Sequence, residues 1–298
     1  MPPGLDSPAV VRYYGWSAIS VATPTHTLFF DPFYRSYCGA DWFGADDFRS
    51  ADYIAVTHGH EEHFLDVPVL ARQTGATVIG SSAATRFLRW RRRIPAKQLL
   101  TLDRGGSISV PGFGVDAFGW KHRDIKLGRA IARAVLRGNT TQLAWAWSSA
   151  TRAPFYAPYT GFVLTLPSGL TVMNYNEGFN TKMTDRDIAG LARRFRVDVL
   201  LAGMQLDFVG DVRRGVAALE PKMVLLYPPH EKFHEMMGAR SRPWSEFTAA
   251  AQDAAPHAKV VALAPGTQVR LGDGAVSQFR RHSVQSSAES PPAIPAST

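Results

Sequence analysis

The chain has 298 residues, of which 45% are hydrophobic and 19% are charged. This composition is that of an ordinary globular protein, so it excludes a fully disordered or fibrous chain. The 33 basic and 25 acidic side chains give a formal net charge of +8, which raises the question of an anionic partner without answering it.

The use of cysteine and the hydropathy pattern point to a reducing compartment. A single cysteine, Cys38, excludes an intrachain disulfide framework and a cysteine-rich zinc site. No apolar run approaches the ~18 residues that a membrane-spanning helix needs, and the first ten residues lack the basic-then-apolar order of a signal peptide. We therefore expect a cytoplasmic protein and interpret Cys38 as a bystander rather than a nucleophile.

The first half of the chain reads as a hairpin followed by a buried strand. Apolar runs at 18–22 and 27–31 flank a turn that contains Pro24. A further apolar run at 52–56 predicts a strand that ends at Thr57.

The second half repeats this plan with a helix inserted. Runs at 161–166 and 170–175 flank a Pro-Ser-Gly turn, and a strand is predicted at 197–202. The helix begins at Thr184, and Asp187 three positions on resembles a capping box with Asp in place of Glu. Its apolar residues recur with helical spacing at Ile188, Leu191, Ala192 and Phe195.

The end of the chain contains further strands and then a change in composition. A strand at 223–227 follows a Glu-Pro break, and a last strand pair is predicted at 260–264 and 268–271. Residues 273–298 are rich in Ser, Ala and Pro and predict a disordered tail. We expect residues 1–272 to form one α/β domain in which two sheets have helices outside them.

Metal-binding chemistry is concentrated directly after the strand at 52–56. His58 and His60 are two residues apart in extended geometry, so they face one side, and Gly59 allows a tight turn between them. Glu62 and His63 follow at the start of a helix predicted at 63–73. Three histidines and a carboxylate within six residues are ligands suited to zinc, iron or manganese.

This motif resembles that of the metallo-β-lactamase superfamily, His-x-His-x-Asp-His after a strand. Here the motif reads His58-Gly-His60-Glu-Glu62-His63, and Asp31-Pro32 at the end of the first hairpin is a further shared feature. The chain looks closest to the branch of ascorbate-phosphate lactonase-like and N-acylphosphatidylethanolamine phospholipase D-like proteins. The resemblance implies an αββα four-layer sandwich with one or two metals at the edge between the sheets, which agrees with the repeated plan above.

The resemblance also implies a set of ligands. His58, His60 and a later histidine, for which we choose His122, would hold the first metal. The second metal would be held by Glu62, His63 and His230, the last of which follows a strand. His234 is a competing choice for the position given to His230.

The chain departs from the family pattern at two positions. Glu62 is one methylene longer than the usual Asp, so the second site is expected to be reshaped. The bridging Asp of the family aligns with Asn176, which is neutral and a weak ligand. This change favours a single metal, a different metal, or rescue by Glu177.

The resemblance implies a metal-dependent hydrolase, with Glu62 and Asn176 as the residues beside the reacting water. Metal coordination lowers the pKa of water from 15.7 to roughly 7, so a small ester, lactone, amide or phosphodiester can be attacked without a serine or cysteine nucleophile. We expect Zn²⁺ first, with Fe or Mn as alternatives. An iron-dependent redox enzyme and a degenerate, non-catalytic protein of the same fold remain alternative interpretations.

An insertion at 123–160 separates the two halves and begins with a basic amphipathic helix. Its basic face is formed by Lys126, Arg129, Arg133 and Arg137, and its apolar face by Leu127, Ile131, Ala134 and Val135. Three interpretations stay open: a lid over a small-molecule substrate, a peripheral contact with an anionic membrane, and a packed helix with a solvated basic face.

A second basic block surrounds Trp90 and contains Arg86, Arg89, Arg91, Arg92 and Arg93. We interpret it as a solvated helix end in preference to a phosphate-binding surface. Nucleic acid is not an expected partner, because the nucleic-acid-processing relatives carry a large additional domain. The sequence does not indicate the oligomeric state.

Overall fold

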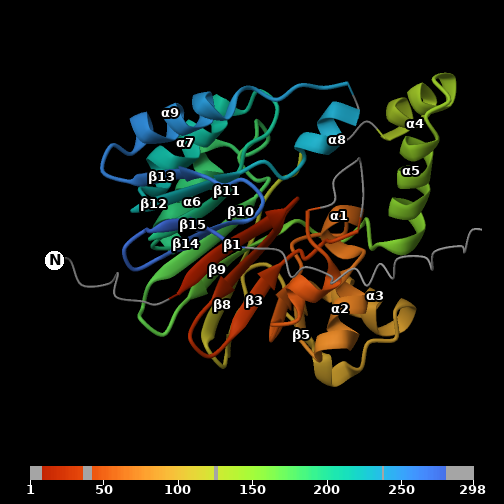
Figure 1. The fold of residues 1–298 in the computed structure, drawn as a ribbon, viewed down its shortest axis with the longest axis horizontal. Coiled ribbons are helices and arrows are strands. Elements are labelled where there is room, and N and C mark those ends of the chain that lie inside the picture. The colour runs from red at the N-terminus through yellow and green to blue at the C-terminus, as the bar shows by residue number, and fades with distance from the viewer. Residues whose placement is uncertain (1–8, 36–41, 124–126, 237, 280–298) are drawn as a thin grey trace, which may run out of the picture.

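Two β-sheets lie face to face at the centre of the molecule (Figure 1). The computed structural model describes residues 9–35, 42–123, 127–236 and 238–279. Within these residues, the first sheet contains eight strands in the order β15 (Val276–Gln278), β14 (Thr267–Arg270), β1 (Val10–Gly15), β2 (Ala18–Ala22), β3 (Thr27–Phe30), β4 (Tyr53–Ala55), β5 (Thr77–Gly80) and β6 (Leu99–Thr101). The second contains seven in the order β13 (Lys259–Ala262), β12 (Met223–Tyr227), β11 (Val199–Gly203), β10 (Thr171–Asn176), β9 (Thr160–Thr165), β8 (Phe113–Gly119) and β7 (Ser107–Val110).

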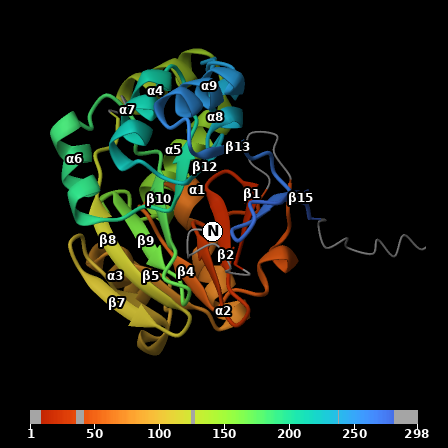
Figure 2. The same ribbon diagram turned by 90° about the vertical axis from the view of Figure 1, so that its left-hand side faces the viewer.

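Helices cover the outer faces of the two sheets. Apolar residues of α2 (Val67–Thr74) and α3 (Ser82–Arg91) pack on the first sheet. Those of α6 (Asp185–Arg194), α7 (Val209–Leu219) and α9 (Trp244–Ala254) pack on the second. In Figures 1 and 2, α7 and α9 lie at one end of the molecule and α2 at the opposite end. The layer order is therefore αββα, which confirms the predicted fold class.

The core between the sheets is built from the inward-facing residues of both. Phe30 of β3 and Phe162 of β9 are fully buried, and their rings stack with centroids 6.1 Å apart. Large apolar side chains from the two sheets therefore meet directly, and their burial provides the main stabilisation of the fold.

The repeated plan of the two halves is present in the strand pairing. In the first half, β2 and β3 are antiparallel and β4 runs parallel to β3. In the second half, β9 and β10 are antiparallel and β11 runs parallel to β10. The helix of the second half begins with the predicted capping box between Thr184 and Asp187. The carboxyl ends of β3 and β10 consequently occupy equivalent positions in the two sheets.

Two predictions at the end of the chain are wrong in detail. The last two predicted strands form as β13 and β14 but do not pair: β13 lies parallel to β12, whereas β14 lies antiparallel to β1. The chain crosses between the sheets after β13, where Gly266 adopts a φ of 93° and donates its N–H to the Tyr13 carbonyl oxygen. Residues 276–278 of the predicted tail form β15 on β14, and residues 280–298 lie outside the described chain.

The helix predicted at 63–73 is divided into α1 (Glu61–Phe64) and α2. The break falls at Asp66, whose carboxylate accepts hydrogen bonds from Tyr34 N–H and from the Arg35 side chain. Pro68 follows as the second residue of α2, where the missing N–H disrupts no helical hydrogen bond.

The insertion at 123–160 forms two helices, α4 (Leu127–Leu136) and α5 (Thr140–Arg152), and α5 packs against α1 (Figure 1). Ala134 is buried as predicted, but Val135, predicted on the same apolar face, is 60% exposed. Cys38, Lys126 and the side chains of Arg129 and Arg133 lie outside the described residues. Among the helices that are described, none combines the length and the apolar character needed to cross a bilayer. The remaining short helices are α8 (Glu231–Met236) and the 3₁₀ turns Ala45–Phe48 and Ala96–Gln98.

Candidate metal centre

The histidine motif lies on the loop that follows β4 and on α1 itself, at the edge between the two sheets. His58, His60 and His63 are all buried. The ring centroid of His58 is 4.4 Å from that of His60 and 4.0 Å from that of His63. The three imidazoles therefore converge, as the spacing of the motif predicts.

The Asp31 carboxylate anchors the start of this loop through hydrogen bonds with Thr57. Its Oδ1 accepts the Thr57 N–H at 2.8 Å, and its Oδ2 accepts the Thr57 hydroxyl. Nδ1 of His63 lies 2.7 Å from Asp31 Oδ2. Because an ionised carboxylate only accepts hydrogen bonds, His63 carries its proton on Nδ1 and presents Nε2 to the interior, as ligating histidines commonly do.

A first group of possible ligands contains one atom each from four buried residues, and these atoms all lie within 4.8 Å of one another. The members are His58, His60, His122 and Glu177. His122 follows β8, and its Nδ1 lies 2.6 Å from the Arg123 carbonyl oxygen. A carbonyl can only accept, so Nδ1 is the protonated nitrogen and Nε2 is the one left for a cation.

A second group within the same 4.8 Å limit contains Glu62, His63 and His230. His230 follows β12 in the loop that leads to α8, as its position after a strand predicts. The competing residue, His234, lies in none of the groups of possible ligands that the described residues form. Its Nε2 lies 2.9 Å from Nη2 of Arg123, and because a guanidinium only donates, that lone pair is already engaged.

Glu177 lies between the two groups and faces both. Its Oε2 is 3.0 Å from His122 Nε2, on the side of the first group. Its Oε1 is 2.7 Å from His230 Nε2 and 3.1 Å from His63 Nε2, on the side of the second. This is the arrangement of a carboxylate that can be shared by two cations.

Asn176 faces the opposite way, toward the groups behind the histidines. Its Nδ2 donates to Asp31 Oδ2 at 2.9 Å and to Thr57 Oγ1 at 2.8 Å. The residue ends β10 at a bulge with a φ of 53°, a left-handed conformation that Asn tolerates better than most residues. Its amide therefore connects the second half of the fold to the Asp31–Thr57 pair of the first.

Two residues of the centre were not assigned direct roles from the sequence. Asp31 entered only as part of a shared feature, yet it contacts the motif and groups with His58 and His63 as a possible ligand. Glu177 entered only as a rescue for Asn176, yet it has the central position. The repeated plan could have pointed to Asp31. Asp31 comes directly after the first hairpin, and Asn176 ends the second hairpin at the equivalent position.

The charge states suit cation binding. Burial and the neighbouring imidazoles hold the pKa of His58 and of His60 well below the usual histidine range, so both are neutral at pH 7. Burial alone would raise the pKa of Glu177, but the facing His230 and His122 rings hold it well below its usual range. Burial lowers the pKa of His63, but the carboxylates of Asp31, Glu177 and Glu62 together outweigh burial and raise it to about 10. A cation that binds at His63 Nε2 would displace the proton that Nε2 carries when the ring is protonated.

Several buried polar atoms of the centre make no hydrogen bond to any described residue. His60 Nε2, Glu62 Oε2 and His230 Nδ1 are buried without a hydrogen bond from any described residue. An unsatisfied buried polar atom costs about 1–3 kcal/mol, so three in one place need an explanation. Imidazole and carboxylate donors without thiolates are a set that zinc, iron and manganese accept. The residues present therefore fit a metal.

The end of the insertion forms one wall of the centre. The Tyr159 ring stacks on His122 with centroids 4.7 Å apart, and the Phe155 ring lies 4.9 Å from that of His60. A Cβ on Gly59 would come within 1.8 Å of the Pro154 carbonyl oxygen, so only glycine permits this contact. The residues that close the insertion thus cover the histidine loop.

Two facing sheets in αββα order, with a buried histidine and carboxylate centre at their edge, define a metalloenzyme of the metallo-β-lactamase type. No family model matches the chain. A UPF0173 metal-dependent hydrolase from Anaeromyxobacter dehalogenans is 30% identical over 216 residues, which are 70% of this chain and 69% of that relative. The chain belongs to the UPF0173 metal-dependent hydrolase family.

Solved structures share the fold at low identity. Igni18, a metallo hydrolase from the archaeon Ignicoccus hospitalis, aligns with a TM-score of 0.62 and 17% identity over 91% of this chain and 99% of that chain. The metallo-β-lactamase fold protein YhfI from Bacillus subtilis aligns with a TM-score of 0.56 and 10% identity over 88% and 99%. CmlA, a diiron β-hydroxylase from Streptomyces venezuelae, aligns with a TM-score of 0.59 and 17% identity over 92% and 54%.

The predicted superfamily and the predicted enzyme class are confirmed: the protein is a metal-dependent hydrolase with the metallo-β-lactamase fold. The narrower resemblance to the lactonase-like and phospholipase D-like branch stays a prediction.

Proposed function

We propose that the protein hydrolyses a small ester, lactone, amide or phosphodiester with water activated at a two-cation centre. His58, His60 and His122 would hold the first cation, and Glu177, which faces both groups, would contribute to holding the first and the second. The second set is completed by Glu62, His63 and His230. The observation that carries this proposal is the position of Glu177, whose two carboxylate oxygens face the two groups.

Several residues of the chain have separate roles around the reacting water. When bound, the metal lowers the pKa of water to roughly 7 and polarises the oxygen of the electrophile. Glu62 Oε2 is buried without a hydrogen bond, so this oxygen is available to accept a proton from the water. Asp31 fixes the tautomer of His63, Thr57 Oγ1 contacts Nδ1 of His58, and the buried position of the histidines limits the access of bulk solvent. Asn176 acts through Asp31 rather than on the substrate.

We propose Zn²⁺ as the first choice of metal, because neutral imidazoles form most of the donor set. The insertion at 123–160 acts as a lid, and its contacts with the His60 and His122 rings support this role over that of a distant membrane anchor.

A second candidate function is oxidation at an iron pair. Glu62, Glu177 and Asp31 place three carboxylates around the histidines, and oxygen ligands suit iron and manganese better than zinc. CmlA shows that a diiron β-hydroxylase can have this fold. Iron in the purified protein together with substrate-dependent oxygen consumption would favour this candidate.

The deciding experiment measures metal content and turnover in the same preparation. Protein purified without added metal is assayed for bound metals and for hydrolysis of a panel of chromogenic esters, amides, lactones and phosphodiesters, before and after treatment with a chelator. We expect turnover that is lost with the metal and recovered with Zn²⁺. The His60→Ala variant should lose both metal and turnover, and the His257→Ala variant, which removes an exposed histidine, should lose neither. Full metal content in His60→Ala would contradict the assignment.

A further inference from the structure

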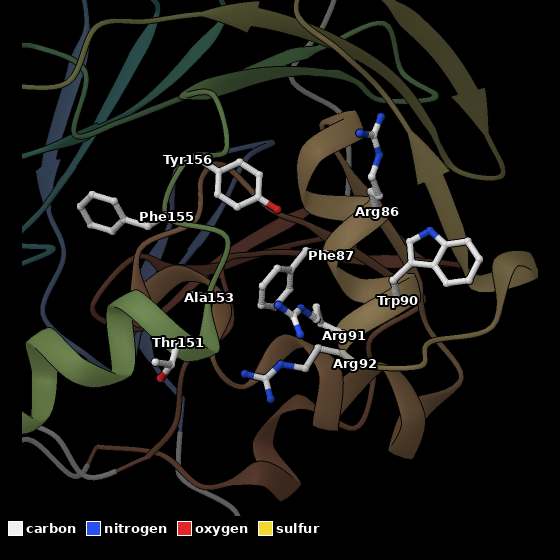
Figure 3. A pocket seen from close by; sticks show the side chains of 9 residues that line it. All are labelled: Arg86, Phe87, Trp90, Arg91, Arg92, Thr151, Ala153, Phe155 and Tyr156. Carbon is white, nitrogen blue, oxygen red and sulfur yellow. The ribbon is translucent and has the colours of Figure 1, made fainter.

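A cavity of about 700 Å³ lies beside the metal centre, between α3 and the chain that follows α5 (Figure 3). This volume is within the range of small-molecule sites in proteins. Arg86, Arg91 and Arg92 line one side, and Tyr156 lines the other. None of these residues takes part in the chemistry proposed above.

The cavity has a positive charge that the protein does not balance. Throughout the described chain, no carboxylate pairs with Arg86, Arg91 or Arg92. Arg92 is partly buried, donates to the Arg152 carbonyl oxygen, and has an Nε that is buried without a partner. Its burial and the nearby guanidinium of Arg152 lower the pKa of Arg92. Guanidinium groups that line one cavity without carboxylates favour a bound anion, and those of Arg86 and Arg91 can each present two parallel donors to a carboxylate or phosphate.

Aromatic side chains give the cavity an apolar component. Phe87 lies on the same face of α3 as Arg91, and Figure 3 shows the two side chains next to each other, facing the chain after α5. The Arg92 guanidinium lies 5.7 Å from the centre of the Phe87 ring, which holds it over an aromatic face. Tyr156 is 72% exposed on the opposite side. An anionic group attached to an apolar body matches this combination better than a free inorganic ion does.

Phe155 connects the cavity to the metal centre. The residue lines the cavity, and its ring lies 4.9 Å from that of His60. The preceding residue, Pro154, contacts Gly59 of the histidine loop. The arginine cavity and the metal centre therefore share Phe155 as a common wall and are adjacent sites.

We propose that this arginine cavity, formed by Arg86, Arg91 and Arg92, binds the negatively charged end of the substrate. The substrate class is a partly apolar molecule that carries a carboxylate or a phosphate, with its hydrolysable bond at the metal centre. The inference rests on the proposed hydrolytic function for the identity of the ligand as substrate, but the anion site itself does not depend on it.

The first test measures binding to protein from which metal has been removed, so that the metal centre cannot hold the probe. Phenyl phosphate, benzoate and the neutral benzyl alcohol are titrated by calorimetry against the wild type, Arg91→Gln and Arg89→Gln. Arg89 is on the same helix but does not line the cavity, so it controls for the change in net charge. We expect both anions to bind and benzyl alcohol not to bind. Loss of a charge-assisted contact in Arg91→Gln should weaken anion binding about tenfold or more, with less than about a twofold change in Arg89→Gln.

The second test distinguishes a substrate site from a site for a separate anion. Metal-loaded proteins are assayed with neutral 4-nitrophenyl butyrate and with 4-nitrophenyl hemiglutarate, which carries a carboxylate. We expect Arg91→Gln to lower kcat/KM about tenfold for the charged ester only. Equal anion affinity in the two variants would overturn the site. Weaker anion binding with unchanged ester selectivity would overturn its role as a substrate site. Hydrolysis of neither ester would count against the proposed function, and the calorimetry would still decide whether the cavity binds anions.

Discussion

The side-chain amide of Asn176 donates a 2.9 Å hydrogen bond to Asp31, the carboxylate that also accepts the N–H of Thr57 at the start of the histidine loop. Asp31 ends the first hairpin and Asn176 ends the second, so this contact joins the equivalent points of the two halves. Both residues have positive φ angles, 41° and 53°, although neither is glycine. Backbone strain of this kind, held by surrounding contacts, is concentrated at functional sites.

The first prediction concerns the support that Asp31 gives to His63. Asp31→Asn removes the charge that orients the His63 ring, so metal affinity should fall about 10- to 100-fold, as for other partners of ligating histidines. A competition titration with a chromogenic chelator measures the affinity. Asp52→Asn is the control, because Asp52 also accepts a backbone N–H, from Thr27, but lies outside the groups of possible ligands. Equal metal affinity in the two variants would contradict the role given to Asp31.

The second prediction concerns the core between the sheets and uses one type of substitution at two depths. Leu164 on β9 is fully buried between the sheets, whereas Leu136 on α4 is 87% exposed. Leu164→Ala should lower the free energy of unfolding by about 2–5 kcal/mol, because it removes buried methyl groups and leaves a cavity. Leu136→Ala should change it by less than about 0.5 kcal/mol. Urea denaturation of both variants measures the difference, and a large effect at Leu136 would show that α4 is covered in solution.

The fold could be predicted largely from local patterns. The apolar runs at 18–22 and 27–31, and those of the second hairpin, identify strands because they alternate with turn residues, and each hairpin closes within a few residues. The pairing of β13 and β14 could not be predicted in this way. Partners β12 and β1 are both distant in the sequence, and only packing between the sheets determines that the chain crosses from one to the other.

The candidate site likewise contains residues that the local sequence identifies and one residue that it does not. His58, His60 and His63 are identifiable as candidate ligands because they are close in sequence and follow a strand. Glu177 is different, since its importance depends on which way two adjacent side chains point. The bulge at the end of β10 turns Asn176 toward Asp31 and leaves Glu177 facing the histidines, and nothing in the local sequence indicates this register shift.

The third prediction concerns pH and the cap of α6. Asp187 accepts hydrogen bonds from Lys121 Nζ at 2.6 Å and from Thr184, and these contacts lower its pKa from 3.8 to about 2. A pKa lowered on folding stabilises the protein above the ordinary pKa, and the stabilisation is lost as the pH falls from about 4 through about 2. Asp187→Asn should therefore be less stable than the wild type at pH 6, and the difference should shrink at pH 3. Urea denaturation at the two pH values measures this, and a difference that grows at pH 3 would contradict the assignment. Lys121→Met should remove much of the pH dependence, because it removes the main cause of the shift.

The last prediction concerns the number of metals and separates the roles of two adjacent residues. Glu177 faces both groups of ligands, so Glu177→Gln removes the shared negative charge and should lower the metal content from near two ions per chain toward one or none. Asn176→Asp puts a carboxylate 2.9 Å from that of Asp31, where one of the two must take up a proton or move away. That variant should therefore have a lower Tm but an unchanged metal content. Metal analysis, a binding titration and thermal denaturation of both variants decide the matter. If Asn176→Asp gains metal while Glu177→Gln retains it, the bridging position belongs to residue 176, and the role proposed for Glu177 is wrong.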